Sequence, residues 1–322
     1  MIKPFIEKLL AQAIDQKVSD IYVIPHQADY QIRFRRLQAV TIWQTVPFAT
    51  GLQIMTYFKF HADMAVSENR RPQVGALTWT HEQLPVELRF STVGDYAGKE
   101  SLVIRLIYPY TATQAAYLVP QQATTLMQLA GKRGLMVFAG PTGSGKTTTM
   151  YATASRLCTT ALVLTIEDPV EIKESRFIQL QVNPTAGMTY ADLIKVGLRH
   201  RPDVFIIGEI RDQVTAQAAV RAALSGHLVL TTVHARSAAG TISRLTELGV
   251  SLQQLRQVLT AACYQRLIPR VTQVPAVLLD ILTTDTIWDA ASQMTEGWRQ
   301  TLEQAVRAGT ITTTTQQNFR AG

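Results

Sequence analysis

The stretch "LMVFAGPTGSGKTTTMYATASRL", residues 135–157, decides the fold of the larger part of this chain. Its first five letters are apolar and predict a buried strand, and the letters after Lys146 predict a helix. Between them, Gly140 to Thr147 match the pattern G-x-x-x-x-G-K-[ST] in the strand–loop–helix context that the pattern requires. The stretch therefore predicts a loop that binds nucleotide phosphates at the start of a helix.

Each part of this loop has a chemical role. Its glycines let backbone N–H groups converge on phosphate oxygens, and the helix adds its partial positive charge. Lys146 is expected to reach the β- and γ-phosphates, and Thr147 to offer a hydroxyl to Mg²⁺. The predicted nucleotide-binding residues are Gly140, Pro141, Thr142, Gly143, Ser144, Gly145, Lys146, Thr147 and Thr148.

Outward from the loop, short apolar segments alternate with helical stretches. These segments are "LVLTIED" (162–168), "VFIIGE" (204–209), "HLVLTTVH" (227–234) and "AVLLDIL" (276–282). Strands that are apolar on both faces and alternate with helices indicate an α/β fold, with a mostly parallel sheet covered on both sides. Ligands of such sheets bind beyond the carboxyl ends of the strands.

Acidic residues follow two of these strands. Glu167 and Asp168 are adjacent in "TIEDPVE", so at most one should face the γ-phosphate, and Glu167 is the candidate for polarising the attacking water. The alternative is a turn with an N-capping acid. The strand in "VFIIGEIRD" ends in Gly208 and Glu209, although this position of a phosphate-loop ATPase normally carries Asp.

The two histidines of "HLVLTTVH" do not form a joint metal site. His227 and His234 are seven positions apart, which on a strand means roughly 23 Å and opposite faces. Only His234, at the carboxyl end, is expected to contact the γ-phosphate. His227 is interpreted as structural.

The N-terminal part has a different pattern. "DIYVIP" and "YQIRFRRL" alternate like paired strands, and "PVELRFSTV" and "ESLVIRLI" flank a hairpin loop, so we expect a small α+β domain with an antiparallel sheet. The polar segment 109–120 is the predicted linker between domains 1–110 and 111–322. "TITTTT", residues 310–315, is expected to be a strand or a frayed end.

Composition excludes several classes of protein. No apolar run approaches the roughly 18 residues of a membrane span, and two cysteines exclude a disulfide framework or a four-cysteine zinc site. The net charge of +7 is a mild, distributed excess. The "RFRR" cluster, residues 33–36, is interpreted as a solvated strand face; the alternative is a DNA-binding protein that uses ATP as a switch.

Four segments in order carry a resemblance to a known family. "GPTGSGKTT", "TIEDPVE", "LRHRPDVFIIGEIRD" and "SGHLVLTTVHA" resemble the signature boxes of the secretion and type IV pilus ATPase superfamily, and "AACYQRL" (261–267) resembles a further short motif. The resemblance implies a RecA-like ATPase domain in which Gly-Glu replaces Asp-Glu. It makes Glu167, Glu209 and His234 catalytic candidates, with Thr147 and Glu209 at the metal. Which glutamate polarises water and which orders the Mg²⁺ shell is left open.

The N-terminal part resembles the family's PAS-like domain. The segments that carry this are "SDIYVIP" (19–25), with Tyr22 where His is usual, and "RFSTVGDYAGKESLVIRL" (89–106). The resemblance implies that Arg89 and Arg105 swing onto the bound nucleotide as further catalytic residues. The alternative is ordinary surface ion pairing.

Departures from the family pattern narrow the subfamily. The chain lacks the Cys-x-x-Cys pairs of many relatives, and no extra N-terminal domain is expected. The chain looks most like the competence ATPase of Gram-positive bacteria, and another type II secretion or type IV pilus ATPase is the alternative. A further departure is Arg201, which stands where many members of the family have Asp.

The resemblance also implies cofactors, partners and a location. The expected cofactors are ATP and Mg²⁺, without zinc. The expected form is a homo-hexamer on the cytoplasmic face of the cell membrane. Its expected partner is a polytopic membrane platform protein, through which it acts indirectly on pilin-like subunits, and no direct nucleic-acid binding is expected.

Overall fold

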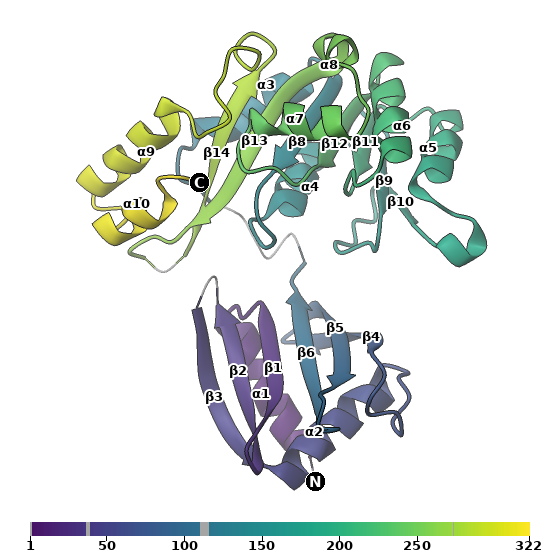
Figure 1. Ribbon diagram of the computed structural model, residues 1–322, viewed down its shortest axis with the longest axis vertical. Helices are drawn as coiled ribbons and strands as arrows, with labels where there is room; N and C mark the ends of the chain where they lie inside the picture. Colours follow the sequence, from purple (N-terminus) through teal and green to yellow (C-terminus); the bar gives the residue numbers. More distant parts are fainter. Residues whose placement is uncertain (1, 37–38, 110–115, 273) are drawn as a thin grey trace. The chain divides into compact units, whose positions relative to one another are not determined.

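The computed structural model describes residues 2–36, 39–109, 116–272 and 274–322. The chain divides into two compact units, Met1–Thr113 and Gln114–Gly322 (Figure 1). Part of the predicted linker 109–120, residues 110–115, lies outside the described residues.

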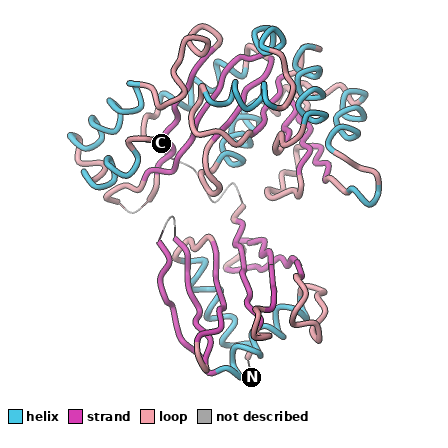
Figure 2. The backbone as a smooth tube through the Cα atoms, viewed as in Figure 1, coloured by secondary structure: helices cyan, strands magenta, loops and turns pink. Residues whose placement is uncertain are grey.

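The N-terminal unit contains a six-stranded sheet in the order β3-β2-β1-β6-β5-β4, and all neighbouring strands are antiparallel. The predicted antiparallel sheet and its hairpins are therefore confirmed (Figure 2). The elements are α1 (Lys3–Asp15), β1 (Asp20–His26), β2 (Asp29–Arg36), β3 (Ala39–Pro47), α2 (Phe48–His61), β4 (Gln73–His81), β5 (Leu84–Gly94) and β6 (Glu100–Ile107).

The core of this unit joins α1, α2 and one face of the sheet. Ile6, Leu10 and Ala13 recur at helical spacing on α1 and are fully buried, as are alternate strand residues such as Ile21 and Val23. The core also encloses one ion pair. Lys59 Nζ lies 2.9 Å from Glu100 Oε1, and both side chains are almost completely buried.

The C-terminal unit contains an eight-stranded sheet in the order β10-β9-β11-β12-β8-β13-β14-β7. Among the described residues, only β13 and β14 pair in the antiparallel sense, so the sheet is mixed but mostly parallel, as predicted. Its strands are β7 (Ala116–Tyr117), β8 (Gly134–Ala139), β9 (Val163–Glu167), β10 (Ile178–Gln181), β11 (Val204–Ile207), β12 (Leu228–Thr232), β13 (Leu259–Ile268) and β14 (Ala276–Thr283).

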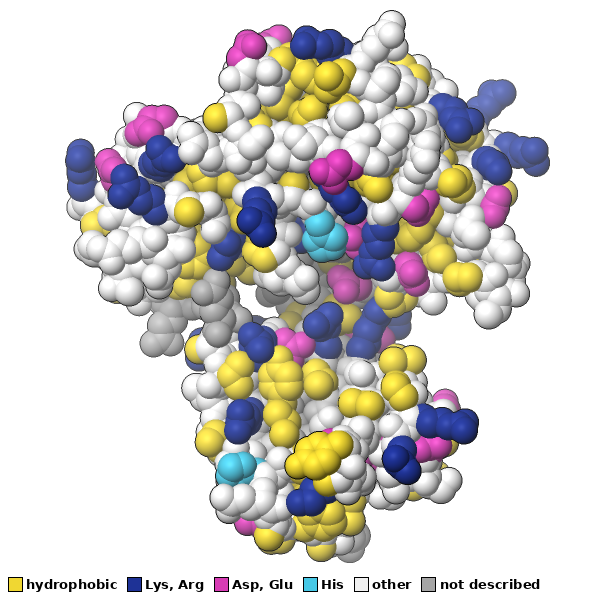
Figure 3. All heavy atoms as spheres, in the orientation of Figure 1, with side chains coloured by type: hydrophobic (Ala, Val, Ile, Leu, Met, Phe, Trp, Pro, Cys, Tyr) yellow, Lys and Arg dark blue, Asp and Glu magenta, His cyan; other side chains and the backbone are white. Residues whose placement is uncertain are grey.

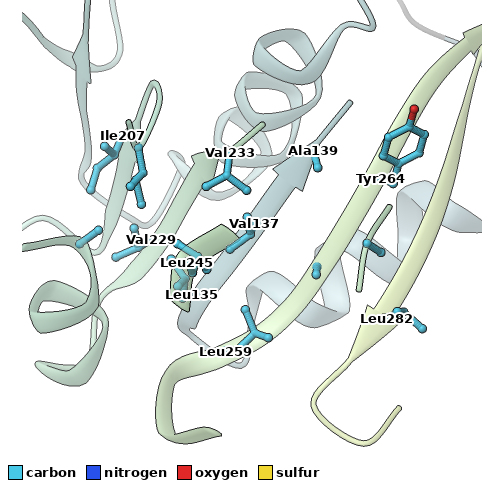
Figure 4. Packing of buried hydrophobic residues seen from close by; sticks show 14 of the residues in the cluster. Leu135, Val137, Ala139, Ile207, Val229, Val233, Leu245, Leu259, Tyr264 and Leu282 are labelled. Carbon is cyan, nitrogen blue, oxygen red and sulfur yellow. The ribbon is translucent and has the colours of Figure 1, made fainter. Parts of the chain in front are cut away.

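Helices cover the sheet of the C-terminal unit. They are α3 (Gln121–Ala130), α4 (Lys146–Leu157), α5 (Tyr190–Arg199), α6 (Gln213–Leu224), α7 (Gly240–Glu247), α8 (Leu252–Val258), α9 (Glu296–Arg307) and α10 (Thr313–Phe319), with a 3-10 turn at Pro184–Ala186. One large core packs alternate strand residues against helices (Figure 4); its labelled members are Leu135, Val137, Ala139, Ile207, Val229, Val233, Leu245, Leu259, Tyr264 and Leu282.

The expectation for residues 310–315 was wrong. The side chain of Thr312 caps α10 by accepting a hydrogen bond from Thr315 N at 3.1 Å, so the threonine run begins a helix. A hydroxyl at the N-cap position outweighs the strand preference of the β-branched residues that follow. No helix within the described residues combines the length and apolar character that a membrane span needs.

Candidate nucleotide-binding and hydrolysis site

The predicted phosphate loop joins the carboxyl end of β8 to the start of α4. Gly145 immediately precedes the helix with φ of 83°, a left-handed conformation that favours glycine. Among the described residues, no side chain caps α4, whereas Asp212 caps α6 by accepting a hydrogen bond from Thr215 N. The first N–H groups of α4 are therefore free to bind an anion, and the loop fits the phosphates of a nucleotide.

Lys146 is held over this loop. Its Nζ donates hydrogen bonds to the carbonyl oxygens of Gly140 at 2.9 Å and Pro141 at 3.0 Å. Burial lowers the pKa of Lys146, and the carboxylates of Glu209 and Glu171 oppose this shift. The ammonium group therefore lies in the field of Glu209, a predicted site residue, and of Glu171, to which the sequence assigned no role. Thr147 and Thr148 follow it in the first turn of α4.

Two predicted site residues, Glu209 and His234, lie side by side at the ends of adjacent parallel strands. Glu209 follows β11, His234 follows the neighbouring β12, and His234 Nε2 lies 2.8 Å from Glu209 Oε1. The other carboxylate oxygen, Oε2, lies 2.7 Å from a guanidinium nitrogen of Arg211, and this contact raises the pKa of Arg211. Arg211 therefore orients Oε2 of Glu209, whereas Oε1 is close to His234 but has no hydrogen-bond partner among the described residues.

The sequence pattern assigns no role in the site to Arg211 or Asp212. Asp212 is structural, since it caps α6. Arg211 instead fixes the carboxylate of Glu209. The only signal was the position of Arg211, two residues after Glu209.

Glu167 lies at the end of β9 and is buried, whereas the adjacent Asp168 is exposed. The Tyr151 hydroxyl on α4 donates a hydrogen bond to Glu167 Oε1 and accepts one from Gln179 Nε2 at 2.7 Å. Burial, and then the charge of Glu167, raise the pKa of Tyr151, so its hydroxyl stays protonated and able to donate. The hydrogen bond from Tyr151 therefore links Glu167 to α4, the helix that begins at the phosphate loop. This differs from the alternative interpretation of an N-capping acid.

Gly208 explains why Asp is missing from this acidic motif. A Cβ atom at this position would lie 3.3 Å from Glu167 Cγ and 3.3 Å from the Tyr190 hydroxyl, tighter than most Cβ contacts. An aspartate here would press its side chain on Glu167. Glycine leaves space for the two carboxylates, Glu167 and Glu209, at neighbouring strand ends.

Arg89 and Arg105 lie opposite each other on β5 and β6 of the N-terminal unit. Arg105 Nε is 3.1 Å from Asp20 Oδ1, and the Arg105 side chain is half exposed. Asp20 also pairs in register with Arg35, so the arginines share one face of the sheet. The approach of Arg89 and Arg105 to a nucleotide stays a prediction.

Arg33 and Arg35 of the "RFRR" cluster share a half-exposed face of β2, which agrees with the interpretation from the sequence. Arg33 donates to Gln31 Oε1, Arg35 donates to the Tyr22 hydroxyl at 2.6 Å, and Phe34 between them is buried. Charge elsewhere is also dispersed: Figure 3 shows basic and acidic side chains interspersed over the visible face.

His227 is structural, as predicted. Its Nδ1 lies 2.7 Å from Pro202 O, and its ring meets Phe205 edge-on. Within the described ranges, no cluster of three or more His, Cys, Asp or Glu residues could hold a metal. A Mg²⁺ ion held by Thr147, one carboxylate, phosphates and water needs no such cluster. Arg201 is exposed with a positive φ of 49°.

A phosphate loop between a parallel strand and an uncapped helix, with two carboxylates at neighbouring strand ends, defines a P-loop ATPase. The chain belongs to the Type II/IV secretion system protein family, whose model matches residues 1–315. The resemblance found in the sequence is thereby confirmed, and the chain is an ATP hydrolase of this family.

Individual relatives agree with this assignment. The competence protein ComGA of Streptococcus pneumoniae (strain ATCC BAA-255 / R6) is 40% identical over 312 residues, covering 97% of this chain and 96% of that protein. The type IV pilus assembly ATPase TfpB of Acinetobacter baylyi is 36% identical, covering 87% and 49%. The ATPase DotB of Legionella pneumophila has a similar fold, with a TM-score of 0.74 at 19% identity over 98% of this chain and 94% of that chain.

Proposed function

We propose that this chain is the ATPase motor that drives assembly of a competence-type pseudopilus for DNA uptake. The observation that carries the proposal is the 40% identity to a competence protein over nearly the whole of both chains. Identity to the pilus assembly ATPase is lower, at 36%. Assembly of another type II secretion or type IV pilus system is the alternative within the same family.

The site geometry supports a division of labour between its residues. Lys146 and the N–H groups at the start of α4 bind the phosphates, and Thr147 with Glu209 would hold Mg²⁺, which neutralises phosphate charge. Arg211 holds Oε2 of Glu209 in place, and His234 lies 2.8 Å from Oε1, which has no hydrogen-bond partner among the described residues. Tyr151 holds Glu167, which is our candidate for polarising the attacking water.

The finer features of the motor belong to the same proposal. The C-terminal unit is a RecA-like domain and the N-terminal unit is PAS-like, with Arg89 and Arg105 reaching the nucleotide when the two approach. The working form is a homo-hexamer on the cytoplasmic face of the membrane, bound to a polytopic platform protein that lifts pilin-like subunits. ATP and Mg²⁺ are its cofactors, with neither zinc nor direct DNA binding.

ATP turnover by the purified chain tests the enzymatic part of the proposal. We expect Mg²⁺-dependent hydrolysis that is lost in Lys146→Ala, and a Glu209→Gln variant that retains ATP without hydrolysing it. Turnover that persists in Lys146→Ala would contradict the proposed site. Unchanged turnover in Glu209→Gln would remove Glu209 from the catalytic set and leave the loop assignment intact.

A further inference from the structure

The strand that contains the "AACYQRL" motif lies directly beside the phosphate loop. β13 pairs in parallel with β8, with Tyr264 opposite Ala139, so Gln265 comes next to Gly140, the first residue of the loop. Gln265 is fully buried. A buried amide at this point needs hydrogen-bond partners, because burying an amide without them is costly.

One of those partners is the backbone of the loop. Gln265 Nε2 donates a hydrogen bond to Ser144 O at 2.7 Å, joining residues 121 positions apart in the sequence. A Cβ atom at Gly145 would lie 3.2 Å from this nitrogen, and one at Gly140 would lie 2.4 Å from Gln265 O. Gln265 therefore packs against both ends of the loop, and its contacts account for glycine at each end.

The hydrogen bond acts on a specific peptide group. The peptide between Ser144 and Gly145 is planar and trans, so its C=O and N–H point in opposite directions. With the Ser144 carbonyl turned toward Gln265, the Gly145 N–H points to the opposite side. That N–H belongs to the stretch that, in a phosphate loop, supplies donors to the phosphates.

Two other polar atoms close to this hydrogen bond do not stabilise the fold. Gln265 Oε1 and Ser144 Oγ are both buried and have no hydrogen-bond partner among the described residues. An unpaired buried acceptor is destabilising. An apolar side chain of similar length would avoid the unpaired Oε1 but would leave the Ser144 carbonyl oxygen without its donor, so the hydrogen bond to the loop is what the amide provides.

We propose that Gln265 is a positioning residue that sets the orientation of the Ser144–Gly145 peptide and thereby the affinity of the loop for nucleotide phosphates. The neighbouring residues of the motif face the other side of β13, where Tyr264 packs against Trp298 and Arg266 lies over Phe319. One residue of the motif, Gln265, therefore contacts the phosphate loop, and its two neighbours contact the C-terminal helices.

Binding of a fluorescent ADP analogue to the full chain tests this role. Gln265→Met keeps the length of the side chain and removes the donor, so we expect binding about fivefold weaker, the effect of one net hydrogen bond. Gln304→Met, on an exposed position of α9, is the matched control and should bind like the wild type. Thermal unfolding of each variant verifies that it is folded.

A second variant separates positioning from packing. Gln265→Glu has the same shape, but its carboxylate faces the Ser144 carbonyl as an acceptor against an acceptor, whereas its protonated form can donate. We therefore expect its affinity, expressed as a ratio to the wild type at the same pH, to be lowest at pH 8 and to recover as the pH falls toward 5.5. A side chain with no influence on the loop would leave this ratio independent of pH. The pH series stands by itself if Gln265→Met does not fold.

The outcomes separate this role from the proposed nucleotide site on which it rests. Wild-type affinity in Gln265→Met, or a pH-independent ratio in Gln265→Glu, would overturn the role of Gln265 alone. Failure of the wild type itself to bind ADP would overturn the nucleotide site and the role of Gln265 together.

Discussion

Replacing Tyr151 with Phe removes a single buried oxygen between the phosphate helix and an acidic residue of the site. The hydroxyl donates to Glu167 and accepts from Gln179 at 2.7 Å. A hydrogen bond to a charged group contributes about 1.5–3 kcal/mol, which corresponds to about a tenfold to hundredfold change in an equilibrium or rate constant. Because Glu167 is expected to act on the water and not on the bound nucleotide, the loss should appear in kcat.

The assay is steady-state ATP hydrolysis, with nucleotide affinity measured separately. We expect Tyr151→Phe to lower kcat about tenfold or more while the affinity for ATP changes less than threefold. Tyr96→Phe, on a fully exposed side chain of the N-terminal unit, is the matched control. Wild-type kcat in a folded Tyr151→Phe would refute the reasoning that this hydroxyl orients Glu167, and an equal loss of affinity would place its effect on nucleotide binding instead.

Three other changes test separate parts of the structure. Gly208→Ala places a Cβ 3.3 Å from Glu167 Cγ. It should lower ATP turnover about tenfold, which corresponds to about 1.4 kcal/mol of activation free energy, and leave the affinity for ATP unchanged. Wild-type turnover would contradict the effect of this contact. Lys59→Ala leaves Glu100 buried without its partner and should lower the free energy of unfolding in urea by about 3–5 kcal/mol. Lys3→Ala, in an exposed ion pair, is the control and should lower it by about 0–1 kcal/mol. Equal effects of the two substitutions would refute the contribution of the buried pair. Burial lowers the pKa of Lys146 from 10.5, so the ammonium is present below the lowered pKa and lost above it; ADP affinity should fall as pH rises toward 10, and Lys146→Arg should be flat over the same range.

The local patterns of the sequence predict most of the site. The loop around Lys146 and the strand ends at Glu167, Glu209 and His234 follow from apolar runs, glycine spacing and the rule that parallel strands end at one edge. The antiparallel sheet of the N-terminal unit follows from period-2 alternation in the same way. These features depend on residues that are close together in sequence.

The contacts that organise the site depend on the order of strands, which no local pattern contains. Tyr151 reaches Glu167 across the sheet from α4, and Gln265 reaches Ser144 because β13 is inserted next to β8. The need for glycine at position 208 arises from the nearby side chain of Glu167 on the neighbouring strand. The threonine run at 310–315 was misjudged because strand propensity gave no account of the Thr312 cap.

The central claim is that ATP hydrolysis at this site drives pseudopilus assembly. The direct measurement is natural transformation, with surface pseudopilin counted in parallel, in a strain whose chromosomal copy carries Glu209→Gln at wild-type protein level. The account predicts that both transformation and surface pseudopilin are lost, while Gln304→Met supports both. Normal pseudopilin assembly and transformation in the Glu209→Gln strain would contradict it.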